Sequence, residues 1–229
     1  MTAIELTTGT AAQLLTPTNG SAARRGLVLW PDVFGCRPLF VDHAQRLADQ
    51  HRWNVVVVEP YPGQTELSVE QRLATAGQLN DDAKLADSEA AADACQVEPV
   101  GVMGFCMGGM WTMKAMASAR FDRAVAFYGM IRLPPHWAGP RMGDAIDVVA
   151  SHSSTELLAI FGTNDPWCPI EHIDELEALG RRVHVVRYPG ADHGWAQDPA
   201  RDNYRPEDAA DAWRRAESFL ATGATPTRV

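Results

Sequence analysis

Short apolar runs alternate along this chain with longer segments in which apolar residues recur at helical spacing. The longer segments predict amphipathic helices within residues 40–51, 68–95, 110–119, 169–179 and 206–220. The apolar runs predict strands at residues 27–30, 55–58, 100–103, 123–128, 156–161 and 183–188. Strands that alternate with helices predict an α/β fold with a mostly parallel central sheet and helices on both faces.

The ends of the chain and one internal segment depart from this alternation. Residues 1–20 are expected to add antiparallel edge strands, and residues 222–229 are expected to form a frayed tail. Residues 131–154 are rich in Pro, Gly and Ser and predict a loop. Because the 229 residues contain no internal repeat and no linker, they predict one domain, residues 1–229, without a large lid.

The charge balance and the cysteine content argue against several classes of protein. Twenty basic and 29 acidic residues give a net charge of −9, which disfavours binding to nucleic acid or to an anionic membrane. No stretch approaches the roughly 18 apolar residues of a membrane helix, and the first residues do not resemble a signal peptide. The four cysteines show no zinc-ligand spacing, so we expect reduced thiols and a cytoplasmic protein.

The most informative motif is Gly104-Phe-Cys-Met-Gly-Gly109, which lies between a predicted strand and a predicted helix. A nucleophile framed by glycines at a sharp strand-to-helix turn is typical of the nucleophile elbow. The turn holds its central residue in a strained backbone conformation, and the glycines allow strand and helix to approach closely. Since the central residue is Cys106, the motif predicts a thiol nucleophile.

Two further loops supply the groups that would activate this thiol. Asp165 follows the predicted strand at 156–161, and His193 follows the predicted strand at 183–188. Enzymes with this elbow carry their triad in the order nucleophile, acid, histidine. Active sites in open parallel sheets lie at the carboxyl ends of the strands. The order and the loops together predict a catalytic triad of Cys106, His193 and Asp165.

The predicted roles follow from the chemistry of acyl transfer. His193 would accept the thiol proton and later deliver it to the leaving group, while Asp165 would hold the imidazole tautomer. The developing oxyanion needs backbone N–H donors, which we assign to Met107, after the nucleophile, and to Val33, after the first core strand.

Over residues 20 to 220 the chain resembles the dienelactone hydrolase family of α/β-hydrolases. The matching segments are Asp32-Val-Phe-Gly35, Glu59-Pro-Tyr-Pro-Gly63, Gly104-Phe-Cys-Met-Gly-Gly109, Ala126-Phe-Tyr-Gly129, Gly162-Thr-Asn-Asp165 and Gly190-Ala-Asp-His-Gly-Trp195. The resemblance implies a Cys-His-Asp hydrolase that cleaves a small ester or lactone, without metal or cofactor. The expected partner is therefore a small-molecule substrate, and the protein is expected to be a monomer or a small homo-oligomer.

Two departures from the family concern the substrate. Asp32 stands where family enzymes carry a glutamate that bonds the resting thiol, so Asp32 is the candidate thiol partner. Gln197, followed by the acidic Asp198, lies in the region where they carry a carboxylate-binding arginine. The other substrate-binding candidates on segments related to the family site are Phe34, Tyr61, Arg72 and Trp195.

Alternatives remain open at this stage. A carboxylesterase or a thioesterase would use the same triad, so the residues do not separate these activities from lactone hydrolysis. A binding protein that kept the fold and lost turnover is a second class, which the Asp32 and Gln197 departures favour. A redox or regulatory thiol protein is a third, although Cys106 has no nearby resolving cysteine in the sequence.

Overall fold

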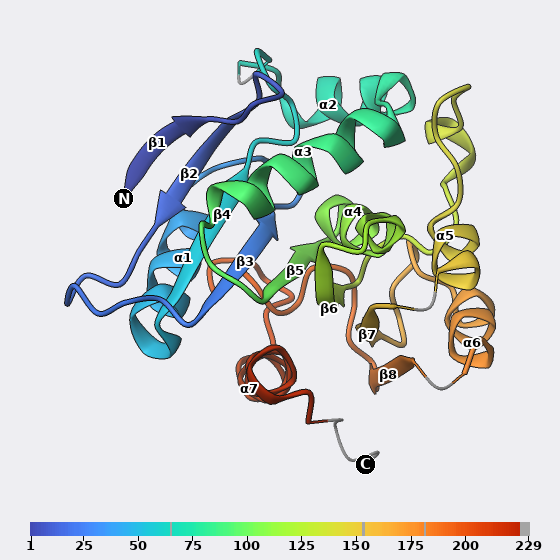
Figure 1. Ribbon diagram of the computed structural model, residues 1–229. Helices are drawn as coiled ribbons and strands as arrows, with labels where there is room; N and C mark the ends of the chain where they lie inside the picture. Colours follow the sequence, from blue (N-terminus) through green and yellow to red (C-terminus); the bar gives the residue numbers. More distant parts are fainter. Residues whose placement is uncertain (65, 153, 181, 225–229) are drawn as a thin grey trace.

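The computed structural model describes residues 1–64, 66–152, 154–180 and 182–224. One sheet crosses the molecule (Figure 1), and its strands follow the apolar runs of the sequence. The strands are β1 (Thr2–Glu5), β2 (Ala11–Leu15), β3 (Arg25–Trp30), β4 (Trp53–Val58), β5 (Val100–Phe105), β6 (Phe121–Phe127), β7 (Glu156–Gly162) and β8 (Val183–Tyr188).

The strand order in the sheet is β1-β2-β4-β3-β5-β6-β7-β8. The pairs β1–β2 and β2–β4 are antiparallel, and every other neighbouring pair is parallel. Because β3 to β8 run in one direction, their carboxyl ends lie along one edge of the sheet. The loops that follow them carry the predicted chemistry to that edge.

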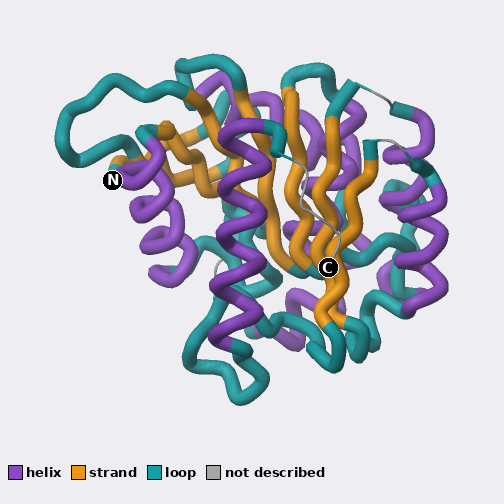
Figure 2. The backbone as a smooth tube through the Cα atoms, turned by 90° about the horizontal axis from the view of Figure 1, so that it is seen from below, coloured by secondary structure: helices purple, strands orange, loops and turns teal. Residues whose placement is uncertain are grey.

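Helices cover both faces of the sheet. They are α1 (Pro38–His51), α2 (Val69–Thr75), α3 (Asp81–Ala94), α4 (Met107–Lys114), α5 (Ala145–Ser151), α6 (Ile170–Ala178) and α7 (Pro206–Thr222), with short 3-10 turns η1 (Ala76–Gln78), η2 (Ala115–Ala117) and η3 (Pro135–Trp137). Helices α1 and α7 lie in front of the strands in Figure 2, while α3 and α4 lie above the sheet in Figure 1.

Each face of the sheet has its own apolar core. Phe40 and Leu47 of α1 pack with Ala216 and Leu220 of α7 on one face. Helices α3 to α6 bury their apolar residues in the second core, on the opposite face. The α/β fold predicted from the alternation of elements is therefore confirmed, with a mostly parallel sheet between two helical layers.

The internal segment at 131–154 differs from the predicted loop. Its Pro and Gly residues lie before position 144, and the residues after it form α5. Ala145, Ile146 and Val149 of α5 are buried against the core, so burial of one helical face outweighs the loop-like composition of the segment as a whole.

The predicted frayed tail falls largely outside the described residues. Thr222 is the last residue of α7, and Gly223 ends the helix in a left-handed conformation with φ 73°. Within the described part of the chain, no helix is long and apolar enough to cross a membrane.

Candidate active site

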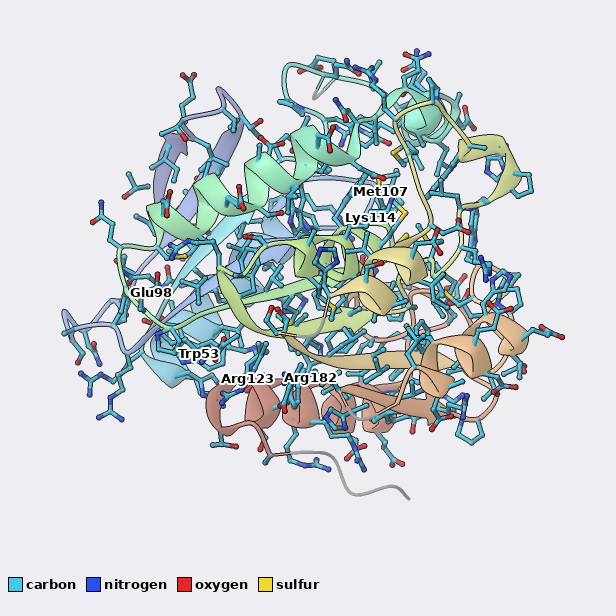
Figure 3. All side chains as sticks on the ribbon, turned by 45° about the vertical axis from the view of Figure 1, so that its right-hand side comes forward. Trp53, Glu98, Met107, Lys114, Arg123 and Arg182 are labelled. Atoms are coloured by element: carbon cyan, nitrogen blue, oxygen red, sulfur yellow. The ribbon has the colours of Figure 1, made fainter. Side chains whose placement is uncertain are left out.

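Cys106 lies at a sharp turn between β5 and α4. Its backbone has φ 57° and ψ −121°, in a region that residues with a side chain rarely adopt. The turn is held because Cys106 N–H donates to the carbonyl of Phe127, 3.0 Å away, on the neighbouring strand. The half-buried thiol follows directly on the end of β5, before the first turn of α4. Figure 3 labels Met107 and Lys114, the first and last residues of that helix.

Two glycines allow this geometry. A β-carbon on Gly104 would lie 2.2 Å from the carbonyl oxygen of Gly108. A β-carbon on Gly108 would in turn lie 2.2 Å from the carbonyl oxygen of Pro31 and 2.3 Å from that of Trp30. Backbone atoms of β3, β5 and α4 therefore meet directly, and this close approach fixes the position of Cys106.

Replacing Gly108 with alanine is expected to destabilise the fold by about 3 kcal/mol, because the new methyl group meets backbone that cannot move aside. For a chain of this size the melting temperature should fall by roughly 6–12 °C. Gly143→Ala is the control, since its β-carbon would meet only Asp81 Oδ2, at 3.8 Å. Thermal unfolding of both variants checks the prediction, and equal melting temperatures would contradict it.

The predicted acid and base lie together at the same edge of the sheet. His193 Nδ1–H donates to Asp165 Oδ2 over 2.8 Å. Asp165 is buried, and its other oxygen accepts the backbone N–H of Trp167 at 2.8 Å. Both carboxylate oxygens are thereby fixed, so Asp165 holds the imidazole in one tautomer and leaves Nε2 to face the reaction.

The charge on His193 depends on Cys106. Burial lowers the pKa of His193, but the charge of Cys106 and hydrogen bonds to Asp165 and Cys106 raise it to about 10. The Nε2 atom is buried, and within the described chain its contact with the Cys106 thiol is looser than an ordinary hydrogen bond, although the thiol is near enough to influence the charge of the ring. The protonation of the imidazole and the charge of the thiol are therefore coupled.

In the wild-type protein His193 should titrate near pH 10, well above the ordinary pKa of 6.5. The Cys106→Ala variant loses the sulfur charge that raises this pKa, while the burial that lowers it remains. The histidine should therefore titrate at a lower pH in the variant. Imidazole NMR shifts followed from pH 5 to pH 11 measure both values. Identical titration curves would show that the thiol does not influence the ring.

The two predicted oxyanion donors are available. Among the described residues, neither the backbone N–H of Val33 nor that of Met107 donates to an acceptor in the protein. Met107 is the first residue of α4, where helix N–H groups have no intrahelical acceptor. Their assignment to the oxyanion hole remains a prediction that this geometry favours.

A pocket of about 160 Å³ opens over the thiol. The residues that line it are Asp32, Val33, Phe34, Val69, Leu73, Cys106, Trp137, Trp167, His193, Gln197 and Arg201. Trp137 comes from η3, so the segment at 131–154 supplies part of the pocket wall. Its ring packs at 5.6 Å from that of Trp167. The pocket suits a small substrate with an apolar surface.

Comparison with known proteins decides the family. The model of the Dienelactone hydrolase family matches residues 10–223 of this chain. The chain belongs to the dienelactone hydrolase family. This membership confirms the predicted class, a dienelactone hydrolase-like hydrolase.

Individual members of the dienelactone hydrolase family agree with this assignment. A Synechocystis protein named as a carboxymethylenebutenolidase is 37% identical over 130 residues, which cover 55% of this chain and about half, 51%, of that protein. Carboxymethylenebutenolidase 2 of Cupriavidus pinatubonensis is 27% identical over 78% of this chain and 77% of its own. A crystal structure from Klebsiella pneumoniae, named as a dienelactone hydrolase, superposes with a TM-score of 0.81 at 23% identity, covering 93% of each chain. That last likeness shows the fold.

Asp32, the position at which this member departs from the dienelactone hydrolase pattern, is held by three donors. Its Oδ1 accepts the backbone N–H of Phe34 at 3.0 Å. Its Oδ2 accepts Arg37 at 2.9 Å and the amide of Gln197 at 3.3 Å. These three donors occupy both carboxylate oxygens of Asp32. The predicted contact between Asp32 and the thiol stays a prediction.

Gln197 links Asp32 to a strained tyrosine behind the histidine. Its Oε1 accepts the hydroxyl of Tyr128, which is fully buried. Tyr128 has φ 38°, and its ring packs edge-on at 5.2 Å from the His193 ring. Gln197 is thus a neutral bridge between the loops that follow β3 and β6.

Three of the substrate-binding candidates lie outside the residues that line the pocket. Arg72 is buried, and its guanidinium lies 3.4 Å from Glu59 Oε1. The hydroxyl of Tyr61 donates to the carbonyl of Arg72 at 2.9 Å. Trp195 is fully buried beside Tyr188, with ring centroids 4.5 Å apart. These three side chains do not line the pocket, whereas the candidates Phe34 and Gln197 do.

The structure also adds residues that the sequence did not single out. Trp137, Val69, Leu73 and Arg201 line the pocket, and all four come from segments without a recognised motif. The negative charge of Asp198 is offset, because its carboxylate pairs with Arg37 at 3.2 Å. Only a prediction of tertiary contacts would have revealed these side chains.

One group of potential metal ligands lies within the site. Ligand atoms of Asp165, Cys168 and His193 lie within 4.8 Å of one another. Burial raises the pKa of the Cys168 thiol well above its usual value, and the thiol donates to the carbonyl of Gly129 at 3.4 Å. A protonated thiol is a poor metal ligand, and the other two groups already bond each other. The bond between Asp165 and His193 therefore suits a catalytic triad better than a metal site.

Proposed function

We propose that this protein hydrolyses a small carboxylic ester or lactone through an acyl-enzyme on Cys106. One observation carries the proposal. A cysteine on a positive-φ turn lies in the same pocket as a histidine whose other ring nitrogen is bonded to a buried aspartate. This is the arrangement of nucleophile, base and orienting acid that acyl transfer requires.

In the first step the Cys106 sulfur attacks the carbonyl carbon of the substrate. The negative charge moves to the carbonyl oxygen, which the N–H groups of Val33 and Met107 would bind. Collapse of this intermediate breaks the bond to the leaving oxygen, and His193 supplies its proton. With a lactone, the new hydroxyl remains attached to the acyl group because the broken bond belonged to a ring.

In the second step water attacks the thioester. His193 Nε2 accepts a proton from the water, and Cys106 leaves as the thiolate. Asp165 keeps its bond to Nδ1 throughout and stabilises the imidazolium. The acid product then departs, and the thiolate and imidazolium are restored for the next cycle.

Carboxylesterase and thioesterase activities use the same groups and remain the alternatives. A non-catalytic binding protein is less well supported, because His193 is hydrogen-bonded to Asp165 and the N–H groups of Val33 and Met107 have no acceptor within the described chain. The relatives named as carboxymethylenebutenolidases favour a lactone substrate. The choice among these substrates requires direct measurement.

The test is a panel of a short p-nitrophenyl ester, an uncharged lactone, an anionic dienelactone and a thioester. Each is mixed rapidly with excess enzyme, and intact mass is recorded before and after turnover. We expect a burst of the first product and a mass increase equal to the acyl group, located on Cys106. Turnover without any adduct on Cys106, or no turnover of any ester, would contradict the proposal.

A further inference from the structure

A tight turn of four residues, from Asp32 to Gly35, follows shortly after β3. The N–H of Gly35 donates to the carbonyl of Asp32 over 3.0 Å and closes the turn. Its first three residues, Asp32, Val33 and Phe34, line the pocket over the thiol. In a trans peptide the carbonyl and the N–H point in opposite directions. Because the carbonyl of Asp32 is bound inside the turn, the N–H of Val33 points out of it.

The two central peptide groups of this turn carry four polar groups, and the protein itself binds three of them. One is the carbonyl of Asp32. The carbonyl of Val33 accepts Arg72 Nη1 at 3.3 Å, and the N–H of Phe34 donates to Asp32 Oδ1 over 3.0 Å. The fourth is the N–H of Val33, which makes no hydrogen bond within the described chain although the residue is buried. The turn therefore holds one backbone donor ready for a ligand.

The bond from the N–H of Phe34 to the Asp32 carboxylate is an Asx-turn, in which a side chain accepts the N–H two residues further on. Aspartate and asparagine have the length for this ring, and serine forms it more weakly. Glutamate carries one more methylene and does not fit it. The shape of the turn therefore depends on the acceptor oxygen at position 32, and a negative charge alone does not provide it.

The second oxygen of Asp32 ties the turn to the loop that carries His193. Asp32 Oδ2 accepts Arg37 at 2.9 Å and the side-chain amide of Gln197 at 3.3 Å. Gln197 lies four residues after His193, and its backbone carbonyl is bonded to His43 of α1 at 2.7 Å. The buried carboxylate is thus held from both ends, so the turn is fixed relative to the loop of the base.

Resting on the function proposed above, we infer that Asp32 is a positioning residue of the oxyanion hole. Its carboxylate closes the Asx-turn that directs the N–H of Val33 to the substrate oxygen, and it keeps this donor in register with His193. The role needs the acceptor oxygen of the side chain and no contact with the thiol. Since an oxyanion donor acts on charge that develops only in the transition state, loss of the role should lower kcat and leave KM nearly unchanged.

Two substitutions separate the acceptor oxygen of Asp32 from its charge. Asp32→Asn keeps the acceptor and loses the charge, whereas Asp32→Glu keeps the charge and loses the Asx-turn. With the best ester of the panel, Asp32→Glu should lower kcat about 10–100-fold, less than the full loss of one oxyanion donor, and change KM less than about twofold. Asp32→Asn should lower kcat no more than about fivefold, the value of one ordinary hydrogen bond. A loss in Asp32→Asn as large as that in Asp32→Glu would overturn the inference.

Three further variants control for charge and for folding. Asp32→Ala removes both the acceptor and the charge and should match Asp32→Glu, while Asp32→Ser offers a weaker acceptor and should lie between Asp32→Ala and Asp32→Asn. Asp198→Asn removes a charge that pairs with the same Arg37, at 3.2 Å, without touching the turn. It should change kcat less than about twofold. An equal loss of kcat in Asp198→Asn and Asp32→Ala would overturn the inference, because charge balance at Arg37 would then explain both.

Alkylation of Cys106 by iodoacetamide separates the oxyanion from the thiol. The sulfur displaces iodide at a saturated carbon, so no oxyanion forms and only the thiol and His193 take part. Asp32→Ala should keep the wild-type rate within about threefold from about pH 5 to pH 10, because Arg37 still has Asp198 as its counterion. A loss of alkylation as large as the loss of kcat would assign Asp32 to the thiol and overturn the inference.

Hydrogen exchange at the amide of Phe34 tests the turn without any reaction. The acceptor of this N–H is Asp32 Oδ1, so exchange should be at least about fivefold faster in Asp32→Ala and Asp32→Glu, and within about twofold of wild type in Asp32→Asn. Equal exchange in all four proteins would overturn the role of Asp32, whether or not any ester is hydrolysed. The expected exchange in a protein that hydrolyses no ester would instead overturn only the proposed reaction.

Discussion

Replacing Cys106 with alanine is expected to lower kcat for the best ester of the panel by at least about 10⁴-fold. The variant lacks the atom that forms the acyl-enzyme, and among the described residues no other thiol lines the pocket. The fold should survive, since alanine keeps the β-carbon at a position whose conformation is set by surrounding backbone. Steady-state kinetics and thermal unfolding of the same preparation measure both effects.

Cys36→Ala is the matched control for this variant. Cys36 lies on the loop after β3, and its thiol donates to the carbonyl of Val57 at 3.5 Å. Burial raises the pKa of this thiol to about 12, so it is expected to be inert. The assignment of the nucleophile would be contradicted if Cys106→Ala kept an activity close to that of wild type, or if Cys36→Ala lost as much activity.

Asp165→Asn should lower kcat by roughly 10⁴-fold while leaving KM nearly unchanged. The amide nitrogen of asparagine can donate to His193 Nδ1, which places the ring proton on Nε2. In that tautomer Nε2 cannot accept a proton from the thiol or from water. The single oxygen of the asparagine side chain can still accept the N–H of Trp167, so the loop should keep its shape.

Asp192→Asn provides the comparison for the acid. Asp192 is the neighbour of His193 in sequence, but its carboxylate accepts the backbone N–H of that residue at 2.7 Å rather than a ring nitrogen. The variant should keep most of its activity. If Asp192→Asn lost more activity than Asp165→Asn, the acid of the triad would have been assigned to the wrong loop.

Much of the fold could be predicted because local pattern and tertiary structure agree. The run Val55-Val-Val-Val58 ends β4, and Asn80 caps α3, which begins at Asp81 within the segment 68–95 that the sequence predicts as helical. In Figure 1 the chain enters α3 separately from α2. Helix α5 was missed because its apolar residues, such as Ile146, become informative only when α4 is present to pack against them.

The same distinction holds for the site. Residues in local motifs could be predicted, and residues placed by long-range contacts could not. Cys106, Asp165 and His193 could be predicted because each stands at the end of a strand, where a parallel sheet brings such residues together. The substrate-binding residues could not be predicted, because the direction of each side chain decides whether it lines the pocket. Arg72 points to Glu59 and leaves the pocket, while Arg201 reaches it across Gly194. Neither direction follows from sequence spacing.

The close contact between backbone atoms at Gly104 and Gly108 sets where the nucleophile lies. The side chain at position 106 sets only which atom reacts. Because the turn is shaped by carbonyl groups of Pro31 and Gly108, exchange of sulfur for oxygen at position 106 would leave the reacting atom in nearly the same place. The reactivity of the site can therefore change in one substitution, without a new scaffold. In evolutionary terms, the elbow allows thiol and alcohol hydrolases to descend from one another through folded, stable intermediates.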